Sequence, residues 1–349
     1  MVYSNAPHCG LPVPVCRTFH TLSNDFISES WTYTDLVAAN GDWHMRVLVT
    51  GGSGYVGHYV IDELYRRGHG VVNADAVRPD GGPKARDYAA MRQSWPDIPT
   101  FLEVDVVDYG QVISAMDGCD AVIALAARPS NANYTEEDVF VTNVASMWNV
   151  CRAAEQLKIR PVVLGSSYNA VGAMGTAARW APQEVKPPEY FPLDQHVYTR
   201  SEEAYSIAKW VGEEVGQGFA RRNPWMSIAS MRFNGMWTDE KFRALAANPI
   251  VDVWERCQGF WTYLHIKDAA AACVLSIESE GWTGHHRFFL NAADTMIDVP
   301  TMDAIAHVYP DVPLRERLEG FRAPISTANA SELIGWSPAY SWRDEQFKP

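Results

Sequence analysis

Tyr205 and Lys209 are the residues whose types and spacing point most directly to chemistry. Residues four positions apart share one face of a helix, so we expect the phenol and the ammonium to lie side by side. A phenol has a pKa of about 10, and a nearby ammonium favours the phenolate and lowers that pKa. Such a tyrosine takes a proton from a carbinol, or returns it to a carbonyl, while a hydride moves to or from a nicotinamide. The pair therefore predicts a general base and acid.

A serine that follows an earlier strand supplies a partner for this chemistry. Ser167 comes directly after a predicted buried strand at 161–164 and the residues Gly165 and Ser166. The carboxyl ends of parallel strands face the ligand crevice, so its hydroxyl is placed to hydrogen-bond the reacting oxygen. The alternative is a serine that only caps a turn. Because it accompanies the Tyr–Lys pair, we predict that Ser167 is catalytic.

A glycine-rich turn follows the first predicted strand and opens a helix. Glycine is needed there because the backbone turns sharply and must approach a pyrophosphate closely, while the helix N-terminus offers free N–H groups and a partial positive charge. The residues predicted to hold the cofactor phosphates are Gly51, Ser53, Gly54, Tyr55, Val56 and Gly57.

Asp75 ends the second predicted strand, 18 residues after Gly57. A carboxylate at this place accepts the hydroxyls of an adenosine ribose and repels a 2′-phosphate, which favours NAD over NADP. Arg78 lies close by and leaves NADP as the less favoured alternative, because an arginine there could bind a 2′-phosphate. Its other interpretation is a solvated loop residue.

Strand and helix patterns alternate from Arg46 onward, with further buried-strand candidates at 121–125 and 161–164. Near-continuous apolar strands separated by helices indicate a parallel sheet covered on both faces. We therefore predict an α/β class, doubly wound (Rossmann) fold. Its NAD-binding domain spans 45–235, and 236–349 is mainly a small α/β substrate lobe with parts that return to the first domain. Residues 1–44 are predicted to be an irregular extension, with no role assigned.

Composition excludes several classes of protein. The 349 residues carry 29 Lys and Arg against 42 Asp and Glu, a net charge of −13, which speaks against binding nucleic acid. No stretch approaches the ~18 consecutive apolar residues of a membrane helix. The six scattered cysteines include no Cys-x-x-Cys pair and indicate reduced thiols in the cytoplasm, and the histidines show no metal-ligand spacing, so we expect no metal.

Taken in order, these motifs resemble the extended short-chain dehydrogenase/reductase superfamily, in its NAD-dependent epimerase/dehydratase branch. The resemblance implies that Asp105 and Val106 contact the adenine and that Asn143 supports a proton relay around Lys209. It also implies a homodimer formed through the helices at 139–158 and 203–221. Further residues implied to line the cofactor crevice are Leu125, Ala126, Ala127, Asn143, Tyr205 and Lys209.

The resemblance also bears on the substrate, a sugar or sugar nucleotide. Tyr168 and Asn169 stand where the family's dehydratases have Asp-Glu, so dehydration is disfavoured. Ser166 to Asn169, with Gly172 after them, is similar to the uronate dehydrogenases, which implies that Arg232 grips a substrate carboxylate through a bidentate pair. The alternative for this residue is a buried structural arginine. The full set of substrate candidates is Arg128, Asn131, Ser167, Tyr168, Asn169, Asn234 and Arg232.

The leading hypothesis is an NAD-dependent oxidoreductase of carbohydrate metabolism, a sugar (uronate-type) dehydrogenase in which Tyr205 is the general base and acid. A sugar-nucleotide 4-epimerase with retained NAD and a carbonyl reductase of hydrophobic ketones remain open. An NAD-sensing regulator without catalytic activity is disfavoured, because such proteins typically lose the catalytic Tyr or Lys and both are present.

Overall fold

The computed structural model describes residues 44–80, 89–129, 133–172 and 187–349. All of them belong to one compact unit, Trp43–Pro349. The predicted N-terminal extension therefore lies outside the described residues, apart from His44, as do Cys9, Cys16 and the substrate candidate Asn131. The four cysteines of the described part are free and buried.

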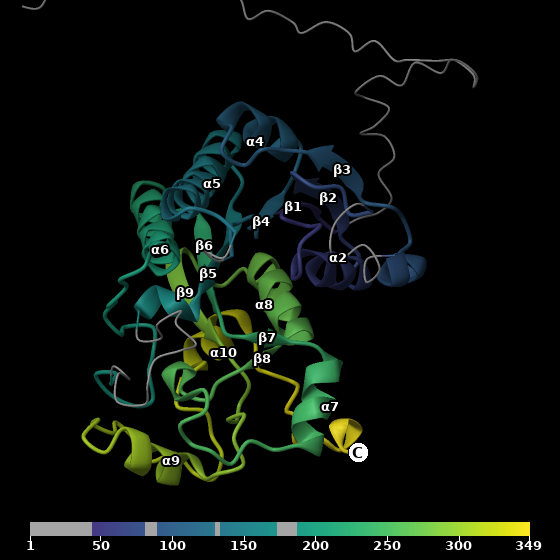
Figure 1. Cartoon of the computed structure of the whole chain (residues 1–349). Coiled ribbons are helices and arrows are strands. Elements are labelled where there is room, and N and C mark those ends of the chain that lie inside the picture. Colours follow the sequence, from purple (N-terminus) through teal and green to yellow (C-terminus); the bar gives the residue numbers. More distant parts are fainter. Residues whose placement is uncertain (1–43, 81–88, 130–132, 173–186) are drawn as a thin grey trace, which may run out of the picture. The chain divides into compact units, whose positions relative to one another are not determined.

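Seven parallel strands form the central sheet, in the order β3-β2-β1-β4-β5-β6-β9 (Figure 1). The inner strands are runs of Val, Ile, Leu and Ala because both of their faces are covered. The predicted doubly wound α/β fold is confirmed. The strand bounds are β1 Arg46–Thr50, β2 Gly70–Asp75, β3 Thr100–Glu103, β4 Ala121–Ala124, β5 Pro161–Ser167, β6 Ser227–Phe233 and β9 Gly284–Leu290.

Helices cover both faces of this sheet (Figure 1). On one face lie α2 (Gly57–Arg66) and α8 (Ile266–Glu278), and on the other lie α4 (Tyr109–Met116), α5 (Glu136–Leu157) and α6 (Ala204–Arg222). Successive residues of a strand point to opposite faces, so Val47 joins the α2 and α8 side while its neighbour Leu48 joins the other. The inner strands thus contribute to two hydrophobic cores, one on each face of the sheet.

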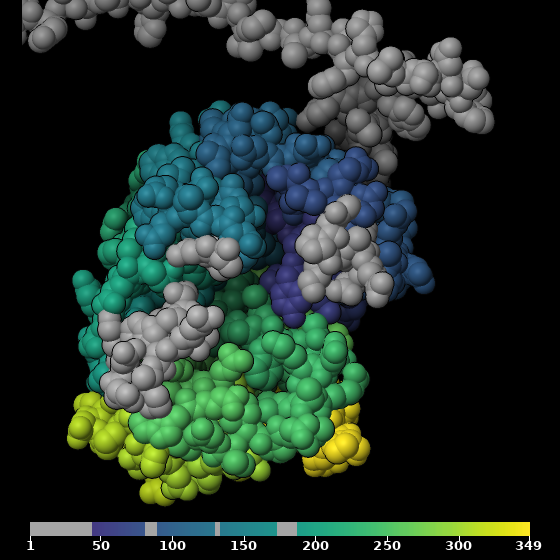
Figure 2. All heavy atoms as spheres, viewed as in Figure 1, coloured from purple at the N-terminus to yellow at the C-terminus, as the bar shows by residue number. Residues whose placement is uncertain are grey.

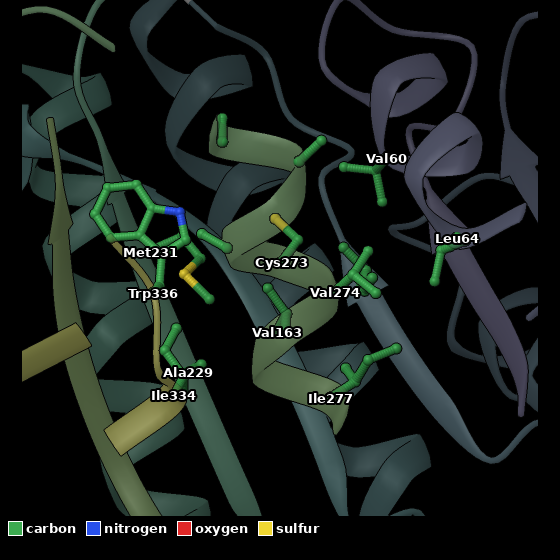
Figure 3. Close-up of a cluster of buried hydrophobic side chains, with 14 of the residues drawn as sticks. Val60, Leu64, Val163, Ala229, Met231, Cys273, Val274, Ile277, Ile334 and Trp336 are labelled. Carbon is green, nitrogen blue, oxygen red and sulfur yellow. The ribbon is translucent and has the colours of Figure 1, made fainter. Parts of the chain in front are cut away.

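The core under α8 can be followed in Figure 3. Cys273, Val274 and Ile277 of α8 lie beside Val60 and Leu64 of α2, in one buried cluster with strand residues below them. A helix that appears late in the sequence is therefore built into the same layer as the first helix of the fold, against the strands β4, β5 and β6.

A third core, rich in aromatic side chains, lies mainly beyond the sheet layers and reaches them at β9. It includes Phe191, Phe242, Trp261, Tyr263 and Phe289, all buried. Strand β9 and helix α8 return to the main sheet layers. The chain after residue 236 therefore contributes both to the aromatic core and to the core between the sheet and helices α2 and α8. The remaining elements are β7 Met236–Trp237, β8 Leu264–His265, α7 Asp239–Ala247, α9 Thr301–Val308, α10 Ala328–Ile334, η1 Arg92–Ser94, η2 Tyr168–Val171, η4 Cys257–Gly259 and η5 Glu345–Phe347.

Two glycines let α6 approach its neighbours closely. A Cβ at Gly212 would lie 1.9 Å from Met147 Sδ of α5, and a Cβ at Gly216 would lie 3.1 Å from Leu164 Cδ1 of the sheet. Gly218, on the same helix, would meet nothing within 4 Å. Helix α6 carries Tyr205 and Lys209. It packs closely on α5 and on the sheet because Gly212 and Gly216 have no side chains at these contacts.

This contrast predicts opposite effects of one substitution on α6. Gly218→Ala should raise the free energy of unfolding by about 0.5–1 kcal/mol, because alanine loses less backbone entropy in a helix. Gly212→Ala should lower it by about 1–3 kcal/mol, since Met147 must move in a packed core. Urea unfolding followed by circular dichroism measures both. Equal gains in the two variants would contradict the close packing of α5 and α6.

Candidate active site

A cleft of about 870 Å³ lies at the carboxyl ends of the central strands. Ligands bind at this edge in doubly wound sheets, and the volume falls within the range of about 300–1,000 Å³ typical of ligand sites. Figure 2 shows a hollow on this face, between purple residues from the early part of the chain and green residues from the later part. Most residues predicted from the sequence to bind cofactor or substrate line the cleft.

The glycine turn lies at the end of β1 and lines the cleft with Gly51, Ser53, Gly54, Tyr55, Val56 and Gly57. Gly51 has φ +73°, and a Cβ there would come within 2.6 Å of Ala126 N. A Cβ at Gly57 would lie 2.2 Å from Gly51 O. Both positions therefore require glycine. The N-terminal residue Val56 makes no side-chain cap of α2, so backbone N–H groups at this end are available to a phosphate.

Asp75 closes β2 beside this turn and lines the cleft. Its Oδ2 accepts the Ser53 N–H at 3.0 Å and its Oδ1 accepts the Val77 N–H at 3.1 Å. Burial raises the pKa of Asp75, and these backbone hydrogen bonds oppose that shift. The carboxylate is thus held in place at the end of β2, where the prediction puts the adenosine ribose.

Arg78 does not line the cleft, in contrast to its predicted cofactor role. Its Nε lies 3.5 Å from Asp80 Oδ1, its guanidinium carbon lies 5.3 Å from the centre of the Phe101 ring, and its side chain is 68% exposed. Of the two sequence interpretations, the structure favours the solvated loop residue. No described arginine therefore competes with Asp75 for the place of a 2′-phosphate.

The next wall of the cleft is formed by residues that follow β3 and β4. Asp105 and Val106, with Leu125, Ala126 and Ala127, line it as predicted. Asn143 is fully buried and does not line it. Instead its Oδ1 accepts the Arg128 N–H at 2.8 Å and its Nδ2 donates to Arg128 O at 3.0 Å. In this structure Asn143 therefore fixes the segment after β4, and a proton relay to Lys209 stays a prediction.

Ser167, Tyr205 and Lys209 all line the cleft, so the structure brings the predicted catalytic residues together. The Glu203 carboxylate caps α6 by accepting the N–H groups of Tyr205 and Ser206, which places Tyr205 in the first helical turn. The Lys209 ammonium lies 5.6 Å from the centre of the Tyr205 ring and donates to Gly165 O at 2.6 Å. Ser167 Oγ also accepts the Asn169 N–H, so the serine caps a turn as well as facing the cleft.

Burial governs the protonation of this group. It raises the pKa of Tyr205 to about 12, against a hydrogen bond with Ser167 that lowers it. Burial lowers the pKa of Lys209 to about 8, against the nearby charge of Glu213 that raises it. The sequence-based expectation of a lowered tyrosine pKa is wrong in this structure, because desolvation of the phenol raises it.

Arg232 corrects the predicted carboxylate clamp. Its side chain is 3% exposed and outside the cleft lining, and it forms two hydrogen bonds, 2.9 and 2.8 Å long, with the carboxylate of Glu213. Glu213 also accepts from Ser166 Oγ at 2.6 Å and from Arg287 Nε at 2.8 Å. Burial raises the pKa of Glu213, but Arg232 and these hydrogen bonds hold it below its usual value. Two of the three guanidinium nitrogens are thus taken by a carboxylate of its own chain, while the buried Nη1 has no acceptor among the described residues.

The remaining substrate candidates of the described part do line the cleft: Arg128, Tyr168, Asn169 and Asn234. Asn234 Oδ1 accepts from Thr262 Oγ1 at 3.0 Å, while its buried Nδ2 has no acceptor among the described residues. Sequence reasoning did not assign Thr142 or Met236, which also line the cleft. Thr142 lies on α5 and Met236 begins β7, and the packing of these elements around the cleft, which the sequence does not express, turns them inward.

Two absences concern the described residues alone. Among them, no helix is long and apolar enough to cross a membrane. In the same part of the chain, no group of three or more His, Cys, Asp or Glu side chains is arranged to hold a metal ion.

Comparison with known families decides the kind of protein. A family model described as "NAD dependent epimerase/dehydratase family" matches residues 47–287, from β1 into β9. The chain belongs to this family. It is therefore related to NAD-dependent epimerases, dehydrogenases and reductases, which are enzymes, and the cofactor predicted from the glycine turn and Asp75 is the cofactor of the family.

Members of the family with different activities are similar to this chain. It is 23% identical to UDP-glucose 4-epimerase of Corynebacterium glutamicum over 326 residues, 85% of this chain and 92% of that enzyme. It is 27% identical to NAD-dependent glucose-6-phosphate dehydrogenase of Haloferax volcanii over 195 residues, 54% and 68%. With cinnamoyl-CoA reductase 1 of Oryza sativa it shares 30% identity over 132 residues, 38% of this chain but only 37% of that enzyme.

A solved structure supports the same fold. UDP-glucose-4-epimerase from Stenotrophomonas maltophila, with bound NAD and formylated UDP-arabinopyranose, superposes with a TM-score of 0.62 at 20% identity, covering 86% of this chain and 95% of that one. At this identity the similarity concerns the fold of the family, and the substrate has to be argued from the cleft.

The contacts of Arg232 predict a loss of stability when this family member loses the guanidinium. Arg232→Met should lower the free energy of unfolding by about 3–5 kcal/mol, because Glu213 keeps a buried charge with one arginine fewer. Adding Glu213→Gln should recover part of the loss, which a double-mutant cycle in urea measures. Unchanged stability with a raised KM would instead restore Arg232 to a substrate role.

Proposed function

We propose that the protein transfers a hydride between the nicotinamide of NAD and a carbinol or carbonyl carbon of a sugar, with Tyr205 as general base and acid. The observation that carries the proposal is the presence of Ser167, Tyr205 and Lys209 in one cleft with the glycine turn and Asp75. Gly51 and Gly57, where a Cβ would collide with neighbouring backbone, and the Asp75 carboxylate, fixed at the end of β2, fit the cofactor.

Each residue of the group has a distinct part in this proposal. Tyr205 takes the proton of the carbinol during oxidation and returns one during reduction. Ser167 is hydrogen-bonded with the phenol and holds the reacting oxygen beside it. Lys209, buried and oriented by Gly165 O, stabilises the phenolate when it forms. NAD, when bound, supplies the hydride acceptor or donor.

A dehydrogenase of free sugars, such as a uronate-type enzyme, is the form of this chemistry that we favour. Tyr168 and Asn169 line the cleft where a dehydratase would need an acid and a base. The uronate assignment no longer rests on Arg232, since Glu213 neutralises it. It now rests on the sequence similarity of the Ser166 to Asn169 segment.

A second candidate is a sugar-nucleotide 4-epimerase, which uses the same first step and then returns the hydride from retained NAD. It is supported by the match to the Corynebacterium epimerase along 92% of that enzyme's length. Reduction of a hydrophobic ketone has weaker support, because the match to the plant reductase spans 37% of that enzyme.

The assembly and location of the protein remain parts of this proposal. We propose a homodimer through α5 and α6, which pack against each other. Val141 and Trp148 lie seven positions apart on one face of α5 and are 56% and 48% exposed in the single chain. Large apolar side chains that are exposed in one subunit are typical of a surface that a second subunit covers. A cytoplasmic location is supported by the free cysteines of the described part.

The first test is the formation of NADH, followed by its absorbance, with purified protein, NAD and a panel of hexuronic acids, aldoses, sugar phosphates and sugar nucleotides. We expect NADH to accumulate with a free sugar. Tyr205→Phe should lower kcat by about 10²–10⁴-fold, because the general base is lost. Tyr198→Phe, at a tyrosine that is 69% exposed, is the matched control and should keep full activity.

The outcomes separate the candidates. A new sugar-nucleotide isomer found by chromatography, without net NADH, would show an epimerase. NADPH oxidation with an aromatic ketone alone would show a reductase. Equal activity of Tyr205→Phe and the wild-type protein would contradict the role of Tyr205 in any of them.

The two shifted pKa values predict the pH profile of oxidation. The reactive form has a Tyr205 phenolate and a protonated Lys209, with pKa values of about 12 and about 8. Below pH 8 both groups hold their protons, so kcat/KM should rise up to about tenfold per pH unit. Above it one proton has left the pair, so the profile should level off. A profile that is flat or falls from about pH 6 to 8 would contradict this arrangement.

A further inference from the structure

We propose that Arg128 binds an anionic group of the substrate, a carboxylate or a phosphate, and so sets the substrate class of the cleft. This inference rests on the proposed function, because it places a substrate beside Tyr205. Arg128 follows β4 and lines the cleft, and its place in the sheet order is between the glycine turn after β1 and Ser167 at the end of β5.

The backbone of Arg128 is held from both sides by one buried side chain. Asn143, on α5, accepts the Arg128 N–H at 2.8 Å and donates to the Arg128 carbonyl at 3.0 Å. Asn143 is fully buried, so it has little freedom to move. The backbone of Arg128, from which its side chain enters the cleft, is thus fixed to the long helix α5.

The guanidinium is oriented as well. Its Nε donates to Thr142 Oγ1 at 3.0 Å, and its central carbon lies 4.0 Å from the centre of the Tyr134 ring. Thr142 and Tyr134 also line the cleft. One hydrogen bond and one stacked ring therefore determine the plane of the group before any ligand arrives, which lowers the entropy that binding must remove.

The edge formed by Nη1 and Nη2 has no partner among the residues that the structure describes, so we infer that it binds the ligand. Among the described residues, no carboxylate forms an ion pair with Arg128 and no acceptor is hydrogen-bonded to these two nitrogens. A guanidinium edge matches two oxygens of a carboxylate or phosphate through parallel hydrogen bonds. Arg232, by contrast, donates from Nε and Nη2 to the carboxylate of Glu213.

Charge along the cleft agrees with this assignment. The acidic residues of its lining are Asp75 and Asp105, which follow β2 and β3, and the basic ones are Arg128 and Lys209. In the sheet order, the acidic residues lie on one side of the glycine turn and Ser167 lies on the other. The reacting end of the described cleft is therefore positive and attracts an anionic substrate.

Calorimetry on the protein loaded with NADH tests the inference without requiring turnover. Glucuronate, glucose 6-phosphate and glucose are suitable probes because they share a ring and differ in the group at C6. We expect at least one anionic probe to bind about tenfold or more tighter than glucose, and Arg128→Gln to remove that preference by about tenfold to a hundredfold. Arg128→Lys should keep part of it, because the charge remains without the paired geometry.

Two controls identify the source of any effect. Arg317→Gln removes one positive charge at an arginine that is 78% exposed, and should change no affinity. Affinity for NADH, from its fluorescence, should be the same in wild type and Arg128→Gln. A fall in NADH affinity with unchanged sugar selectivity would assign Arg128 to the cofactor phosphates and overturn the inference.

The inference and the proposed function fail in different ways. Turnover of a neutral sugar that Arg128→Gln leaves unchanged would overturn the inference while the function stands. Selective binding of an anionic probe, lost in Arg128→Gln, with no hydride transfer to any sugar would support the inference and overturn the function. Binding of none of the three probes at millimolar concentration would overturn the inference.

Discussion

The buried carboxylate of Glu213 is the constraint on which the geometry of the catalytic group depends. It lies on α6 one helical turn after Lys209, and it accepts hydrogen bonds from Ser166 of β5, Arg232 of β6 and Arg287 of β9. Ser166 is the neighbour of Ser167, so one ion-pair network joins the helix that carries Tyr205 to the strand that carries the serine. A buried charge costs solvation energy unless it is paired, so these three donors are required for α6 to keep its place.

The same burial that demands pairing also sets the chemistry. Removing water from the phenol of Tyr205 and the ammonium of Lys209 moves their pKa values apart, the tyrosine upward to about 12 and the lysine downward to about 8. Neither group is charged as readily as in water, so a proton can pass between the phenol and a substrate oxygen at low reorganisation cost. The Gly165 carbonyl holds Lys209 through backbone that is fixed in the middle of the sheet. Protonation and position are therefore governed by the same packed layer.

Local sequence patterns predict the parts of this site that local chemistry determines. The glycine turn and Asp75 could be identified because their properties are local. A Cβ in the turn would collide with nearby backbone, and Asp75 is a carboxylate at the end of a strand. The role of Arg232 could not, because it depends on which of two anions reaches the guanidinium, a substrate or Glu213 from another element. The direction of the Tyr205 pKa likewise depends on how deeply the folded chain covers the phenol, which spacing along a helix does not express. Thr142, on α5, becomes part of the cleft only through the path of the chain from β4 into that helix.

These differences follow from how the fold divides its tasks. The strands β1 and β2 and the turn between β1 and α2 carry the residues proposed to hold the family's cofactor. Since a single ligand would constrain these residue types, they can be recognised in the sequence. The segment after β4 and the residues Asn234 to Met236 after β6 line the same cleft, and the function of a shared fold depends on the side chains that line its site. Arg128 belongs to this second group, yet it is anchored by Asn143 as firmly as a core residue. A mobile arginine would lose much of its binding energy to ordering, whereas this one is ordered before the substrate arrives, and that makes it a determinant of specificity rather than a general source of positive charge.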